Sequence, residues 1–183
     1  MAWIDRRYGN WRGAIRLFLT RAEISLGLSG ERKPERDEVR RLVFVCHGNI
    51  CRSAYADVLA RELGLNAASF GLSTEPGSRA HRPIVKAARE MGVDLAGHRS
   101  MPVEAFRPLP GDLLLAMETR HLRKLAAIQG LSGLPRLLLG RFSGFPHLHD
   151  PYEIAPEYTA PCLGRIDKAV RNAGKAFPGV DLS

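Results

Sequence analysis

The chain has 183 residues, of which 45% are apolar, so it can form one compact domain with a buried core but is short for two. Its formal net charge of +8 favours an anionic partner, such as nucleic acid, an anionic membrane or a phosphorylated molecule. No apolar run reaches the roughly 18 residues that span a membrane, and the three cysteines are too few for a disulfide scaffold. Because no secretory signal is recognisable, we expect a cytoplasmic protein.

Residues 1–40 are a distinct basic segment, for which the sequence predicts an amphipathic helix followed by a charged linker. Apolar residues recur at steps of three and four over residues 1–28, and Gly9 and Gly27 are its expected boundaries. We expect this face to pack on the domain or on a second copy of the chain, as in a homodimer, and the alternative is contact with an anionic membrane. The face comprises Trp11, Ala14, Ile15, Phe18, Ala22 and Leu26, and Arg12, Arg16 and Arg21 fall largely off it.

Residues 41–183 alternate between short apolar runs and helical spacings, which indicates a single domain. We expect strands at 42–45, 67–72, 113–117 and 136–139. We expect helices at 54–63, 83–91, 119–128 and 156–177, the last of which could break at Pro161 or Gly164. The pattern predicts an α/β fold with a four-stranded parallel sheet and helices on both faces, preceded by the extra N-terminal helix.

The loop after the first predicted strand, residues 46–53, has the features of an anion site. Ligands bind at the carboxyl ends of parallel strands, and Gly48 and Asn49 can turn several backbone N–H groups into one concavity. Arg52 can contact two phosphate oxygens, and a Cys46 thiol in this positive field should be acidified and nucleophilic. The alternative is a buried cysteine at a strand end, followed by an exposed arginine at a helix start.

The run VCHGNICRS at residues 45–53 closely resembles the signature of low-molecular-weight protein tyrosine phosphatases. The downstream sequence Asp150-Pro151-Tyr152 resembles the acid loop of that family, and the resemblance spans about residues 41–177. It implies that Cys46 attacks phosphorus and forms a phosphocysteine, while Arg52 and the loop N–H groups hold the phosphate oxygens. Asp150 would protonate the leaving oxygen and then activate water.

The same resemblance implies supporting roles for the rest of the loop. Ser53 would donate its hydroxyl to the thiolate, Asn49 would brace the loop, and His47, Gly48 and Ile50 would complete the phosphate-binding turn. In the family, the cysteine at the position of Cys51 can form a disulfide with the nucleophile under oxidation, and the alternative is a packed small side chain.

The resemblance implies no cofactor, and we expect no metal ion. His147 and His149 alternate as in a strand, but no third ligand accompanies them. Cys162 lies in the last predicted helix, and we expect it in the core.

The expected partner is a phosphotyrosine-containing protein rather than nucleic acid, and in bacterial relatives it is often a tyrosine kinase. Tyr152 is a candidate to stack on an aromatic leaving group. Ile50 is typical of tyrosine-directed members, whereas relatives directed at phosphoarginine carry Thr there. Residues 73–82 contain no aromatic residue to hold a phosphotyrosine ring, and Phe142 and Phe145 are candidates to substitute.

Two other functions remain open. The first is an arsenate reductase on the same fold, although residues 71–107 contain none of the further cysteines that such a relay needs. The second is a phosphate-binding or membrane-associated module without catalysis. The intact set of Cys46, Arg52 and Asp150 favours the phosphatase.

Overall fold

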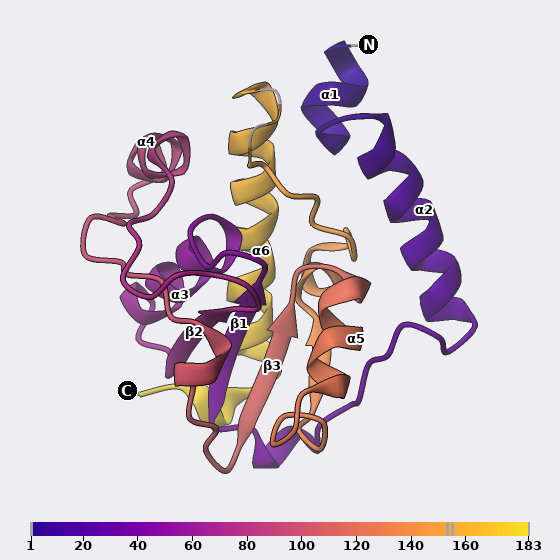
Figure 1. The fold of residues 1–183 in the computed structure, drawn as a ribbon, viewed down its shortest axis with the longest axis vertical. Helices are drawn as coiled ribbons and strands as arrows, with labels where there is room; N and C mark the ends of the chain where they lie inside the picture. The colour runs from indigo at the N-terminus through magenta and orange to yellow at the C-terminus, as the bar shows by residue number, and fades with distance from the viewer. Residues whose placement is uncertain (1, 153, 155, 183) are drawn as a thin grey trace.

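A computed structural model describes residues 2–152, 154 and 156–182 of the chain (Figure 1). Its centre is a parallel sheet in the order β2-β1-β3-β4. The strands are β1 (Arg41–Cys46), β2 (Ala67–Gly71), β3 (Asp112–Ala116) and β4 (Arg136–Leu138). Because all three strand pairs are parallel, all four carboxyl ends lie at the same edge of the sheet. The expected four-stranded parallel α/β sheet is confirmed.

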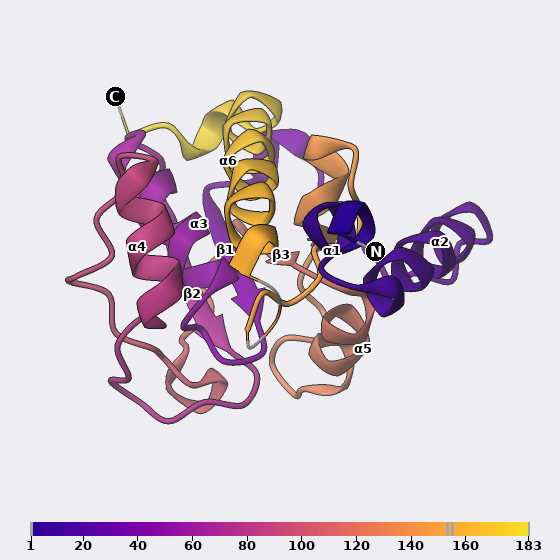
Figure 2. The same cartoon turned by 90° about the horizontal axis from the view of Figure 1, so that it is seen from above.

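Helices cover both faces of this sheet, as Figures 1 and 2 show. Leu42 and Phe44 of β1 enter one core cluster, which also contains residues of α3 (Arg52–Glu62), α4 (Arg82–Glu90) and α6 (Thr159–Ala176). Val43 and Val45 enter a second cluster with residues of α5 (Thr119–Ala127). Successive side chains of β1 therefore meet different helices, which explains its continuous apolar sequence.

Helix α6 runs without interruption, so the expectation that it could break at Pro161 or Gly164 is wrong. Pro161 is the third residue of the helix, where a backbone N–H would have no acceptor within the helix. Gly164 is exposed and lies well inside α6. Proline is therefore compatible with this end of the helix, and a short 3₁₀ turn over Pro156–Tyr158 leads into it.

The N-terminal segment forms two helices, α1 (Ala2–Tyr8) and α2 (Trp11–Ser25), that meet at Gly9. Gly9 has a φ of 81°, and the side chain of Asn10 caps α2 by accepting the Gly13 N–H at 2.9 Å. Helix α2 ends two residues before Gly27, whose φ is 70°. Both glycines therefore mark boundaries, as expected. No helix in the described part of the chain is long and apolar enough to cross a membrane.

Helix α2 turns a different face to the domain from the one we expected. Leu17 is buried, together with Gly13 and Thr20, whereas Ile15 and Phe18 are 48% and 71% exposed. The prediction that the apolar stripe packs on the domain is therefore wrong. The small residues Gly13 and Thr20 face the domain instead, where they permit α2 to approach it closely.

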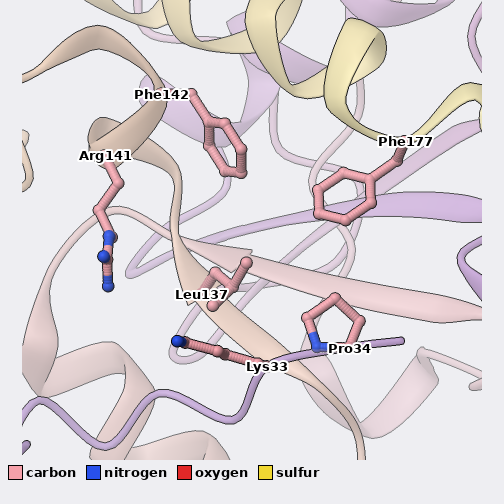
Figure 3. A pocket seen from close by; sticks show the side chains of 6 residues that line it. All are labelled: Lys33, Pro34, Leu137, Arg141, Phe142 and Phe177. Atoms are coloured by element: carbon pink, nitrogen blue, oxygen red, sulfur yellow. The ribbon is translucent and has the colours of Figure 1, made fainter. Parts of the chain in front are cut away.

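The linker covers the outer edge of β4. Arg32 pairs with Arg136 in an antiparallel bridge of two backbone hydrogen bonds of 2.8 Å, and Glu31 accepts the Leu138 N–H. An edge strand covered in this way presents fewer unpaired groups. The linker also borders an open hollow of about 390 Å³, which Figure 3 shows from close by. Its lining residues are Lys33, Pro34, Leu137, Arg141, Phe142 and Phe177.

Candidate active site

Residues 46–53 connect the carboxyl end of β1 to the start of α3, as the sequence predicts. Asn49 has a φ of 52°, which is rare for a residue with a side chain and is best tolerated by Asn. Its N–H donates to Cys46 Sγ at 3.2 Å. Gly71 of β2 lies so close to the loop that a Cβ there would be 2.9 Å from the carbonyl oxygen of His47. The neighbouring strand therefore supports the turn from one side.

Cys46 lies in the loop with two polar groups at its sulfur. Besides the Asn49 N–H, the Ser53 hydroxyl lies 2.9 Å from Cys46 Sγ, so two polar groups contact the sulfur. Cys51 is also buried, but burial and the neighbouring charges of Asp150 and Cys46 raise the pKa of its thiol. The Cys51 thiol therefore stays protonated.

Cys162 is fully buried, as expected for a core residue. Burial raises the pKa of its thiol to about 11, so this thiol is also neutral near pH 7.

A network of hydrogen bonds centred on Asn49 braces the loop. Its side-chain amide donates to Ser53 at 2.8 Å and to Ser69 at 3.0 Å. Its side-chain oxygen accepts the Met101 N–H, and its backbone oxygen lies 2.7 Å from His98 Nε2. The sequence identified Asn49 and Ser53 as site residues but assigned no role to the other three, which lie 20 to 52 positions from Asn49.

Arg52 is fully buried, and two carboxylates form ion pairs with its guanidinium. Nη1 donates to Glu118 Oε1 and to the Leu148 carbonyl oxygen, both at 2.7 Å, and Nη2 donates to Asp150 Oδ2 at 2.5 Å. Burial opposes the charge, but Asp150 and Glu118 raise the pKa of Arg52 above its usual value. Nε is buried and makes no hydrogen bond within the described residues. An oxyanion in the loop would supply the acceptor that this donor lacks.

Glu118 is a site residue that sequence reasoning missed. It directly precedes α5, at the carboxyl edge of the sheet, and is only 5% exposed. Burial alone would raise its pKa, but Arg52, His121 and His147 hold it well below the ordinary value. Its position just after the third predicted strand was the signal that could have drawn attention to it.

The loop that carries Asp150 forms one wall of the site. Asp150 Oδ1 accepts the Tyr152 N–H at 3.2 Å, which fixes the turn around Pro151. A pocket of about 310 Å³ lies between this loop, the loop at residues 46–53 and the segment that follows β2. Its lining residues are Cys46, His47, Gly48, Ile50, Cys51, Ser73, Thr74, Glu75, Ser78, Arg79, Asp150 and Tyr152.

Tyr152 supplies the aromatic ring at this pocket. Tyr152 is 45% exposed, and the centre of its ring lies 4.8 Å from that of His81. The idea that Phe142 and Phe145 take this place is wrong. Phe142 lines the hollow of Figure 3, and Phe145 lies under the guanidinium of Arg165, whose carbon is 4.0 Å from the ring centre.

The N-terminal helices pack directly on the Asp150 loop. A Cβ at Gly9 would lie 3.0 Å from the His149 ring and 3.1 Å from Tyr158. Arg165 also donates to the Arg7 carbonyl oxygen at 2.6 Å. Residues outside the family resemblance therefore touch the direct neighbour of Asp150. Within the described part of the chain, no three His, Cys, Asp or Glu residues gather to hold a metal ion.

The strand, loop and helix together define a class of protein: α/β enzymes that place a cysteine at the base of an anion-binding loop. The family model of low molecular weight phosphotyrosine protein phosphatases matches residues 41–177. The chain belongs to this family.

Curated and solved relatives agree with this assignment. The phosphatase Etp of Escherichia coli K12 is 28% identical over 136 residues, which cover 73% of this chain and 92% of Etp. The crystal structure of the tyrosine phosphatase AmsI of Erwinia amylovora has a TM-score of 0.67 at 26% identity and covers 76% of this chain and 93% of AmsI. Wzb of Vibrio vulnificus, solved with benzylphosphonate, has a TM-score of 0.65 at 26% identity, with 74% and 97% covered.

Relatives with other activities also match. A glutaredoxin arsenate reductase of Synechocystis is 32% identical, but over only 82 residues, or 43% of this chain and 60% of that protein. The arginine phosphatase YwlE, in a mutant with a phosphorylated active-site serine, has a TM-score of 0.62 at 25% identity, with 74% and 93% covered. The arsenate reductase alternative thus rests on a partial match.

Proposed function

We propose that this chain hydrolyses phosphotyrosine in a protein substrate through a phosphocysteine intermediate. The observation that carries the proposal is the environment of Arg52. This buried guanidinium is fixed by Glu118 and Asp150 and retains a buried Nε without a partner in the described chain, at the end of the loop that begins with Cys46. A phosphate oxygen fits this unpaired donor.

In the first step, the Cys46 sulfur attacks phosphorus, an S–P bond forms and the bond from phosphorus to the tyrosyl oxygen breaks. The loop N–H groups and Arg52 hold the equatorial oxygens. Arg52 Nη2 exchanges the Asp150 carboxylate for a phosphate oxygen when substrate enters. Once released from Arg52, the Asp150 carboxylate takes up a proton from solvent and donates it to the leaving oxygen, which departs as a neutral phenol.

In the second step, Asp150 removes a proton from a water molecule that attacks phosphorus. The S–P bond breaks, and inorganic phosphate and the Cys46 thiolate are released. Ser53 and the Asn49 N–H, which lie at 2.9 and 3.2 Å from the sulfur, stabilise the thiolate as it leaves.

The preference for phosphotyrosine is supported by the pocket. Tyr152 offers a ring beside Asp150 on which an aromatic leaving group can stack, and Ile50 is an apolar contact at the loop. An autophosphorylated bacterial tyrosine kinase presents such a group, and we propose one as the partner. We propose the cytoplasm as the compartment, because a nucleophilic thiol needs reducing surroundings.

The test is phosphate release from matched peptides that carry phosphotyrosine, phosphoserine or phosphoarginine. We expect the highest kcat/KM with phosphotyrosine and no turnover by the Cys46→Ser variant. Asp150→Asn should lower kcat by about 10²-fold or more, because the leaving oxygen then departs unprotonated. It should also tighten competitive inhibition by inorganic phosphate several-fold, since no carboxylate competes for Arg52 Nη2.

Full activity in Cys46→Ser would overturn the mechanism. A higher kcat/KM with phosphoarginine would overturn the substrate assignment and leave the mechanism intact. Arsenate turnover coupled to a thiol reductant would favour the arsenate reductase instead.

A further inference from the structure

Helix α2 carries an apolar stripe that points away from the domain, and the proposed phosphatase reaction does not use it. We call Trp11, Ile15, Phe18 and Leu26 the outer face; they are 61%, 48%, 71% and 71% exposed. They recur at helical steps on the side opposite to buried Leu17. Figure 2, which views the molecule from above, shows α2 projecting from the body of the molecule. Apolar area of this kind is unfavourable in water and indicates a partner surface.

Cations flank the outer face. Arg12, Arg16 and Arg21 are all exposed, and residues 11–22 contain no acidic residue. Glu23, the one acidic residue of α2, points to the domain, where its carboxylate pairs with Arg123 of α5 at 2.5 Å. The solvent side of α2 is therefore both apolar and positive.

We propose that the outer face of α2 docks on an anionic lipid surface. The aromatic and aliphatic side chains would enter the boundary between headgroups and acyl chains, and the flanking arginines would contact the anionic headgroups. Tryptophan and phenylalanine suit this boundary, and both Trp11 and Phe18 are more than half exposed. The helix would lie on the membrane and not cross it.

Charge argues against a second copy of the chain as the occupant. A two-fold contact through this face would bring Arg12, Arg16 and Arg21 towards the same residues of the partner. The one carboxylate of α2, Glu23, interacts with Arg16 alone of the three and is already paired with Arg123 of the domain, so most of this positive charge would remain. An anionic headgroup layer supplies the missing negative charge.

The helix pair is fixed to the domain, so docking would also hold the catalytic pocket near the membrane. Gly9 and Gly13 lie against the His149 ring, the Arg7 carbonyl oxygen accepts a hydrogen bond from Arg165, and Glu23 pairs with Arg123 of α5. These contacts connect the proposed lipid surface to the loop that carries Asp150. Substrates held at the membrane would then meet the pocket at a raised local concentration.

The test is flotation of the full-length protein with vesicles of equal parts phosphatidylglycerol and phosphatidylcholine, against vesicles of phosphatidylcholine alone. We expect binding to the anionic vesicles that weakens as salt is added. The triple variant Arg12→Gln, Arg16→Gln, Arg21→Gln should bind about 10²-fold more weakly, since each cation near such a surface contributes about fivefold. Trp11→Ser with Phe18→Ser should weaken binding by at least about tenfold.

The matched control removes three charges from another exposed helix. Arg82, Lys86 and Arg89 of α4 are exposed, and their joint replacement by Gln should leave most vesicle binding intact. Thermal unfolding of every variant confirms that it folds. Equal binding of the α2 and α4 triple variants would overturn the proposal. The proposal would also be overturned if the native chain bound no vesicles and sedimentation velocity showed a dimer that the double variant Trp11→Ser with Phe18→Ser dissociates.

Discussion

Arg52 shows how single residues are held in this site by partners remote in sequence. Its Nη1 reaches Glu118, 66 positions away, and its Nη2 reaches Asp150, 98 positions away. Glu118 also pairs with Arg120, whose side chain is about half exposed. The buried Glu118 carboxylate therefore links Arg52 in the active site to an arginine at the surface. A guanidinium forms paired hydrogen bonds to phosphate only in its own plane. By fixing that plane, Glu118 orients Arg52 for phosphate binding.

We expect Glu118→Gln to lower kcat for p-nitrophenyl phosphate by about 10- to 100-fold, because Arg52 loses a charged anchor and shifts from its position. KM should change less, since the loop N–H groups still bind the phosphate. The matched control is Arg120→Gln, which breaks only the outer ion pair and should retain near-native kcat. Native kcat in Glu118→Gln would contradict a positioning role.

At the scale of elements, the junction of α1 and α2 depends on close approach. Gly13 lies where a Cβ would be 2.0 Å from the Tyr8 carbonyl oxygen and 3.1 Å from the His149 ring. Glycine inside a helix normally costs about 1 kcal/mol relative to alanine. Here the contacts reverse that preference, because the helix would have to move off the loop next to Asp150 to admit a methyl group.

Gly13→Ala should therefore lower the free energy of unfolding by about 1–3 kcal/mol, against the helix propensity of alanine. Gly164→Ala in α6 is the matched control, since nothing lies within 4 Å of a Cβ there. It should raise stability by up to about 1 kcal/mol, or about 2–4 °C in Tm for a chain of this size. Thermal unfolding measures both, and a stabilising effect of Gly13→Ala would disprove the tight junction.

At the scale of the whole molecule, buried histidines make the fold sensitive to acid. Burial, aided by the charge of Arg52, lowers the pKa of His121 to about 3, and burial lowers that of His147 to about 4. In the unfolded chain both histidines take up a proton near pH 6.5, whereas in the folded chain they stay neutral until the pH approaches their lowered pKa values. Stability is therefore highest above about pH 6.5 and falls as the pH drops towards the folded pKa values. Protonation of Glu118, whose folded pKa is also depressed, adds a further loss below about pH 4.5.

Urea unfolding at pH 7.5, 6 and 5 should show this loss, at about 1.4 kcal/mol per pH unit for each histidine that titrates only when unfolded. His121→Leu removes one such group and should flatten the dependence. Its ring nitrogens make no hydrogen bond within the described residues, so the change leaves no donor or acceptor there without a partner. An unfolding free energy that is the same at pH 7.5 and pH 5 would contradict the prediction.

The order of strands and helices followed from the sequence because these signals are local. Four apolar runs predicted the four strands to within a residue or two, and the loop at 46–53 was found because its residues are contiguous. The pairing of Asp150 with that loop needed the family resemblance, since nothing local connects the two segments. Glu118 was missed, and no site role was assigned to Ser69 or His98, for the same reason: each reaches the site from a segment remote in the sequence.

The sequence by itself determined which residues of α2 share a face, because a helical period fixes that without any partner. Only the tertiary structure decided which face meets the domain. An apolar stripe has the same spacing whether it packs on protein or on lipid, so period alone cannot separate the two. The choice came from packing: Gly13 and Thr20 allow α2 to approach the domain, and Trp11 and Phe18 are left outside.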